Sequence, residues 1–161
     1  MRTLWRVSNY SDLKGIGGER LSGRWHTAVQ GRRIVYLSEH PALALTETLV
    51  NLKGTPGLLP NRYQLIKLTV QESVSTELLD LTKLTPNWRD DLAATRALGD
   101  AWLAEGTAIL GVPSVPCPEA SNFLFNPLHP DAPGVAVEWS RWIEYDKRLF
   151  RSHSSIQAEQ R

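Results

Sequence analysis

The sequence contains a single cysteine, Cys117, in 161 residues, which excludes an internal disulfide framework. It also lacks an apolar run near the ~20 residues that a membrane-spanning helix needs, and it shows no signal-peptide pattern. Its 18 basic and 17 acidic residues leave a net charge of +1, so no overall field draws the chain to nucleic acid or to an anionic membrane. We therefore expect a cytoplasmic protein that binds neither directly and whose anion sites are local.

Several familiar ligand motifs are also missing. The run Gly15-Ile16-Gly17-Gly18 lacks the last glycine of the dinucleotide-binding fingerprint, because Arg20 stands in its place. No Gly-Lys-Ser or Gly-Lys-Thr occurs, which excludes a P-loop. The four histidines are scattered and the cysteine is isolated, so we expect no metal site. Ser121 lies in no Gly-x-Ser-x-Gly elbow, which argues against a serine nucleophile.

The length suits one domain, which we place at residues 1–150, followed by a flexible tail at 151–161 that lacks core residues. Apolar and β-branched runs predict strands at 4–7, 33–38, 63–70, 108–113, 122–125 and 135–145, with a brief one at 78–81, and a loop at 54–60. Helical spacing predicts helices at 41–52 and 89–104, and Gly99 permits close packing of the second. Many short strands with two modest helices predict a mixed, strand-rich α+β domain.

Three polar residues stand out beside this expected core. Arg24 follows the glycine-rich run and precedes Trp25, and its planar guanidinium suits bidentate binding of phosphate or carboxylate. Glu47 is the only acid of the first predicted helix and lies on the flank of its apolar stripe, where it can face a cleft. Ser121 lies far downstream. Each also fits an ordinary role, namely a surface ion pair, a solvated helix side chain and a strand-edge hydroxyl.

Taken together, the motifs resemble the RES-domain family, which is named for an arginine, a glutamate and a serine. Five segments carry the resemblance in order over about residues 5–150, namely Gly23-Arg24-Trp25, Val35–Ser38 with Pro41–Glu47, Gly99–Leu103, Val112-Pro113-Ser114 and Ser121–Pro130. RES proteins are toxins of bacterial RES-Xre toxin-antitoxin pairs. The resemblance implies a fold like the ADP-ribosyltransferase (diphtheria-toxin-like) enzymes and an activity that consumes NAD as a substrate, without a metal.

Carried over residue by residue, the resemblance implies a site with defined roles. Arg24, Glu47 and Ser121 are the expected catalytic residues, and Arg24, Tyr36, Ser121, Asn126 and Arg33 are the expected NAD-binding residues. Arg24 would hold a phosphate, Tyr36 would stack on nicotinamide, and Glu47 would bind a ribose hydroxyl and stabilise positive charge on the ribose. Ser121 would donate to a phosphate or to the nicotinamide amide. Two positions depart from the family pattern, His26 and Thr48.

The implied activity is cleavage of the N-glycosidic bond of NAD with release of nicotinamide. Water as acceptor would make the chain a glycohydrolase, and inorganic phosphate would make it a phosphorylase. Two alternatives stay open, an ADP-ribosyltransferase that modifies one protein and a binding module that only holds a nucleotide. Because unrestrained loss of NAD would inhibit growth, the family also implies an Xre-like antitoxin that covers the active site, in a complex where the chain could form a homodimer.

Overall fold

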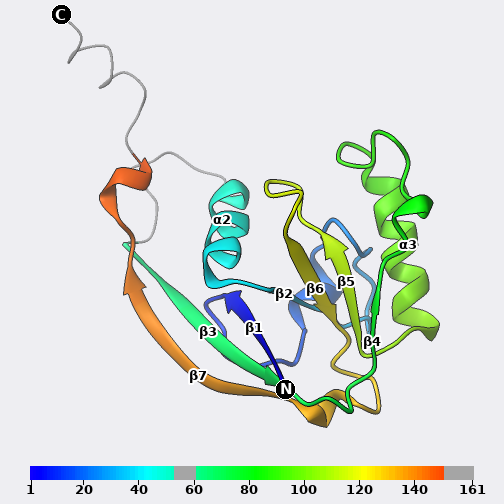
Figure 1. Ribbon diagram of the computed structural model, residues 1–161, viewed down its shortest axis with the longest axis horizontal. Coiled ribbons are helices and arrows are strands. Elements are labelled where there is room, and N and C mark those ends of the chain that lie inside the picture. Colours follow the sequence, from blue (N-terminus) through cyan, green and yellow to red (C-terminus); the bar gives the residue numbers. More distant parts are fainter. Residues whose placement is uncertain (53–60, 151–161) are drawn as a thin grey trace, which may run out of the picture.

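The computed structural model describes residues 1–52 and 61–150, so the expected loop at 54–60 and the expected tail at 151–161 both lie outside the described residues. Seven strands form one sheet in the order β4-β5-β6-β2-β1-β3-β7 (Figure 1). Their bounds are β1 Arg2–Val7, β2 Val35–Ser38, β3 Arg62–Val70, β4 Thr76–Leu78, β5 Ile109–Pro113, β6 Ser121–Phe125 and β7 Val135–Glu144. All neighbouring strands are antiparallel except β4 and β5. The expected mixed, strand-rich α+β class is confirmed.

Two longer helices accompany the sheet, α2 at Pro41–Asn51 and α3 at Leu92–Glu105, together with the short α1 at Gly17–Arg20. Helix α2 begins where the His40 side chain accepts the Ala42 N–H and where proline occupies the first turn. Helix α3 begins at Asp91, whose carboxylate accepts the Ala94 N–H at 2.9 Å. Single turns of 3-10 helix lie at Leu81–Lys83, Ala132–Gly134 and Lys147–Phe150. Within the described ranges, no helix has the length and apolar content needed to cross a bilayer.

The brief strand expected at 78–81 is displaced. Strand β4 occupies Thr76–Leu78, and a 3-10 turn follows it because the Asp80 carboxylate accepts both the N–H and the hydroxyl of Thr82. Such local capping favours a turn over continued strand pairing. The glycine-rich run, expected as a loop throughout, contains α1.

The two faces of the sheet carry different cores. One buried cluster consists mainly of strand residues and includes Phe123 and Phe125. The other contains Leu124, whose side chain points to the opposite face because side chains alternate along a strand. This second cluster also contains Trp25 and Trp102, so it joins the segment after the glycines, helix α3 and the sheet.

Helix α2 follows β2 after only two residues and lies against β1 and β2 (Figure 1). Ser38, the last residue of β2, pairs with Trp5 of β1 on one side and with Asn122 of β6 on the other. The short connection therefore brings Glu47, midway along α2, back over the end of these central strands.

Candidate active site

The Glu47 carboxylate is held by two side chains from distant parts of the chain. Its Oε1 atom accepts hydrogen bonds from the Ser114 hydroxyl at 2.8 Å and from the Asn122 amide at 2.5 Å. Ser114, fully buried just after β5, in turn accepts the backbone N–H of Cys117 at 3.2 Å. Within residues 1–52 and 61–150 no hydrogen bond reaches Oε2. One carboxylate oxygen is thus fixed and the other is available to a ligand.

Glu47 lines a cavity of about 400 Å³ between α2 and the ends of the central strands. A second cavity of about 680 Å³ is lined largely by the glycine-rich run from Gly15 to Gly23. Arg6, Val7 and Tyr36 line both, so the two cavities are neighbours. Together they form a two-part cleft, with the Glu47 carboxylate in one part and basic side chains such as Lys14 and Arg20 along the other.

Arg6 is a cavity residue that sequence reasoning missed. Its guanidinium donates to the backbone carbonyl of Asp12 at 3.0 Å. Burial lowers the pKa of Arg6, and the charge of Asp12 opposes that shift. The signal in the sequence was a charged residue inside the apolar strand Leu4-Trp5-Arg6-Val7.

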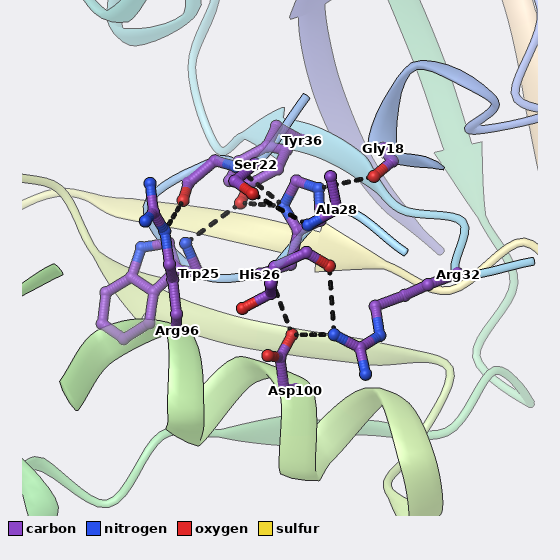
Figure 2. A network of polar contacts seen from close by, with 11 residues as sticks. Gly18, Ser22, Trp25, His26, Ala28, Arg32, Tyr36, Arg96 and Asp100 are labelled. Carbon is purple, nitrogen blue, oxygen red and sulfur yellow. Dashed lines mark hydrogen bonds and ion pairs between the residues drawn. The ribbon is translucent and has the colours of Figure 1, made fainter. Parts of the chain in front are cut away.

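Tyr36 is fixed by a buried polar network (Figure 2). Its hydroxyl accepts the Trp25 N–H at 3.1 Å and lies 2.9 Å from Nδ1 of His26. The same Nδ1 accepts the Gly23 N–H at 3.2 Å, and Nε2 lies 3.1 Å from the Gly18 carbonyl. These partners assign the proton of a neutral His26 to Nε2, so the Tyr36 hydroxyl donates to Nδ1. Tyr36 thereby ties the glycine-rich segment to β2.

Both rings of this network favour their neutral forms. Burial raises the pKa of the Tyr36 phenol well above its ordinary value, against the opposing charges of Arg96 and Arg24. Burial likewise lowers the pKa of His26. The face that Tyr36 presents to the cavities is therefore that of an uncharged phenol.

Helix α3 holds the segment that carries Arg24 from the other side (Figure 2). Arg96 donates to the Gly23 carbonyl at 2.8 Å, and the Thr95 hydroxyl donates to the Arg24 carbonyl at 2.9 Å. Asp100 accepts the Thr27 N–H and pairs with Arg32, both at 2.9 Å. Side chains of α3 thus make four contacts with residues 23–32, and these contacts fix the loop that carries Arg24.

The Arg24 side chain itself has an unused donor. Its Nη1 atom is buried, yet it makes no hydrogen bond to any described residue. A buried guanidinium nitrogen without an acceptor costs free energy that an anionic ligand would offset. The phosphate-binding role expected of Arg24 stays a prediction.

The expected site residues fall into separate places. The Ser121 N–H donates to the Glu39 carboxylate at 2.7 Å, while its hydroxyl makes no described hydrogen bond. Strand alternation turns Ser121 to the face opposite Asn122. Around Glu47, the hydroxyl and amide expected of the site come from Ser114 and Asn122, which sequence reasoning did not select. The role expected of Ser121 stays a prediction.

Arg33 and Asn126 also lie apart from Glu47. They line a third cavity of about 340 Å³, at the ends of β2 and β6 opposite to Ser38 and Asn122. Arg33 is paired with Glu19 at 2.8 Å. The Asn126 side chain accepts the Leu128 N–H at 3.0 Å, which closes a turn. Of the expected site residues, Tyr36 thus lines the cleft together with Glu47. Arg24, next to the lining residue Gly23, is not itself among the lining residues, and Arg33 and Asn126 lie outside the cleft.

Comparison with known proteins identifies the family of this chain. The RES domain model matches residues 3–147, and the chain belongs to the RES domain family. The chain is similar to "Toxin Res" of Pseudomonas putida, 40% identical over 148 residues that cover 91% of this chain and 99% of that protein. It is also similar to the "Prs ADP-ribosylating toxin" of a Sphingobium species, 36% identical over 160 residues that cover 92% and 97%.

A solved structure shares the fold. It is a chain of the M. tuberculosis MbcT-MbcA toxin-antitoxin complex, with a TM-score of 0.67, 17% identity, and coverage of 98% of this chain and 89% of that one. The family and the ADP-ribosyltransferase-like fold expected from the sequence are confirmed.

Proposed function

We propose that this chain is the toxin of a toxin-antitoxin pair and that it cleaves the N-glycosidic bond of NAD. The observation that carries the proposal is Glu47, with Oε1 fixed by Ser114 and Asn122 and Oε2 left to the cavity. A carboxylate held in this way can stabilise positive charge that develops on a ribose ring. The names of two similar proteins, both called toxins, support the biological role.

The reaction breaks the bond between ribose C1′ and the nicotinamide nitrogen. Nicotinamide leaves as a neutral molecule with the electron pair of that bond, and the ribose acquires oxocarbenium character. Oε2 of Glu47 would accept a hydrogen bond from a ribose hydroxyl and oppose this charge. Water then forms the new bond at this same carbon and releases a proton, which gives ADP-ribose. Inorganic phosphate in its place would give ADP-ribose phosphorylated at that carbon, the 1″-phosphate of ADP-ribose.

Two arginines in and beside the cleft suit the diphosphate of NAD. Arg24 offers a buried guanidinium nitrogen without a partner, and Arg6 lies where the two cavities meet. Charge-assisted hydrogen bonds from arginine fix both the position and the orientation of a phosphate. The neutral Tyr36 ring lines both cavities and offers a surface for the nicotinamide or its ribose.

A second candidate is transfer of ADP-ribose to a protein. It shares the bond cleavage but replaces water by a nucleophilic side chain of the target. The name of the Sphingobium relative, "Prs ADP-ribosylating toxin", favours this candidate. In either case an antitoxin of the Xre type would cover the cleft, a proposal supported by the toxin-antitoxin complex among the structural neighbours.

The test is chromatography of NAD and its products with purified protein. We expect the wild type to release nicotinamide, and Glu47→Gln to lower the rate by roughly 100-fold or more through loss of charge stabilisation. Glu105→Gln, an exposed change at the end of α3, is the matched control and should keep the wild-type rate. A folded wild type that leaves NAD intact with and without phosphate contradicts the proposal of free cleavage.

The acceptor is identified in the same assay. With NAD labelled in its adenylate half, label in free ADP-ribose indicates hydrolysis, and label in its 1″-phosphate indicates phosphorolysis. Label that stays on a protein, only when a cell extract is added, indicates the transferase. The Glu47→Gln variant should abolish all three.

A further inference from the structure

We propose that Ser38 is a positioning residue for this reaction, because its hydroxyl orients the Asn122 amide that holds Glu47. The inference rests on the proposed function and adds to it a residue that is not among the site residues expected from the family resemblance. Ser38 contacts Glu47 only through Asn122, so its effect on the reaction is indirect.

The three side chains form a chain of hydrogen bonds with a single direction. The Ser38 hydroxyl donates to Oδ1 of Asn122 at 2.7 Å, and Nδ2 of Asn122 donates to Oε1 of Glu47 at 2.5 Å. An ionised carboxylate can only accept, so the amide must turn its NH₂ toward Glu47 and its oxygen toward Ser38. The serine hydroxyl is the donor that this orientation needs.

Ser38 is well placed to impose that orientation. Its exposed fraction is 4%, and β2 and β6 set it directly opposite Asn122. Its other strand neighbour is Trp5, which also lines the cavity. The indole N–H of Trp5 makes no hydrogen bond to Asn122, so within residues 1–52 and 61–150 the Ser38 hydroxyl is the donor that Oδ1 of Asn122 has.

Loss of the hydroxyl would release the amide. Oδ1 of Asn122 would lose its donor, and rotation of the amide would bring an oxygen toward the Glu47 carboxylate, where two acceptors repel each other. Ser114 would still bind Oε1, but a single hydrogen bond does not fix the plane of a carboxylate. The expected result is a displaced Oε2 and a slower chemical step, with NAD still bound by the arginines.

The kinetic test compares Ser38→Ala, Ser38→Cys and Ser38→Thr. We expect Ser38→Ala to lower kcat roughly 10- to 100-fold, the size expected for a misplaced catalytic group, with KM for NAD changed by less than about 3-fold. Ser38→Thr keeps the hydroxyl and should stay within about 3-fold of the wild type. Ser38→Cys keeps the volume with a weak donor and should resemble Ser38→Ala, which also covers the case in which alanine does not fold. Ser140→Ala removes an exposed hydroxyl of β7 as the matched control.

Two kinetic outcomes overturn the proposal. If folded Ser38→Ala and Ser38→Cys keep the wild-type kcat, the hydroxyl does not position Glu47. If they raise KM with an unchanged kcat, Ser38 contributes to binding and not to positioning.

A second measurement does not depend on NAD cleavage. In ¹⁵N-labelled protein, the side-chain amide protons of Asn122, assigned by their loss in Asn122→Ala, should exchange with water at least about 10-fold faster in Ser38→Ala than in the wild type. Unchanged exchange overturns the inference even if the wild type cleaves NAD. If exchange is faster in Ser38→Ala but the wild type leaves NAD intact, the contact between Ser38 and Asn122 is supported and the proposed function is contradicted. The failure of the inference and the failure of the proposed function are therefore distinguishable.

Discussion

Gly99 of α3 packs directly against the backbone carbonyl of Trp25, and a β-carbon at position 99 would overlap that carbonyl. The contact is between helix and loop backbone, so neither partner can relieve it by a change of rotamer. It sets the distance between α3 and the segment that carries Arg24.

We expect Gly99→Ala to separate helix and loop. Overpacking of this kind destabilises a protein by about 1–3 kcal/mol. The displaced loop would also lower NAD cleavage, because Arg24 and Tyr36 are held through it. Urea unfolding and the nicotinamide assay check both effects. Gly17→Ala, where a β-carbon meets no atom within 4 Å, is the control for stability; equal stability of the two variants would contradict the expected clash.

The roles of Ser114 and Ser121 in the site can be distinguished by substitution. We expect Ser114→Ala to lower NAD cleavage at least about 10-fold, since Glu47 loses a donor, and to cost about 1–3 kcal/mol, since the Cys117 N–H loses its acceptor. Ser121→Ala should have the smaller effect on activity, because its N–H contact with Glu39 is made by the backbone and survives. Rates and unfolding curves of both variants provide the comparison. A larger loss of activity in Ser121→Ala than in Ser114→Ala would contradict this expectation and support the catalytic role that the family motif implies for Ser121.

The arginines allow a similar comparison. Arg24→Ala should raise KM for NAD roughly 10-fold or more, the equivalent of one charge-assisted hydrogen bond. Arg33→Ala should change KM much less, because Arg33 is paired with Glu19 beside the third cavity. Steady-state kinetics on the two variants measure the difference. Equal increases in KM would mean that NAD reaches the third cavity.

His26 should make stability depend on pH in the mildly acidic range. Burial lowers its pKa below the ordinary 6.5, so the unfolded chain takes up a proton first as the pH falls. The contribution of neutral His26 to the free energy of unfolding is complete above pH 6.5 and is lost as the pH falls below that value. Carboxyl groups such as Glu19, whose pKa is lowered, titrate only at more acidic pH.

The measurement is urea unfolding of wild type and His26→Asn at several values between about pH 7.5 and pH 5. The asparagine amide can replace Nδ1 but does not titrate, so the variant should lose less stability over this interval. Parallel curves for the two proteins would rule out His26 as the source.

Local patterns were enough to predict several features of the site. The spacing of apolar residues, with Pro41 at the start, predicts α2 and places Glu47 on its flank. Gly99 was expected to permit close packing, and its contact with Trp25 confirms this. Each of these features depends on residues close in sequence, where helix periodicity and capping decide the outcome.

The partners of Glu47 could not be predicted in the same way. Ser121 and Asn122 are adjacent in sequence, and only the pairing of β6 with β2 and β5 decides which of them faces α2. Ser114 follows β5 in a proline-rich segment without periodicity, so nothing local marks it as buried. Arg6 likewise joins the cleft only because β1 lies at the centre of the sheet.

The contacts between α3 and the loop that carries Arg24 have a genetic consequence. Thr95, Arg96 and Gly99 line neither part of the cleft, yet each contacts the backbone of residues 23–25. In a selection for cells that survive expression of this chain without an antitoxin, inactivating substitutions should therefore recur along one side of α3 as well as in the cleft. Such survivors would carry a protein whose reactive groups are all intact.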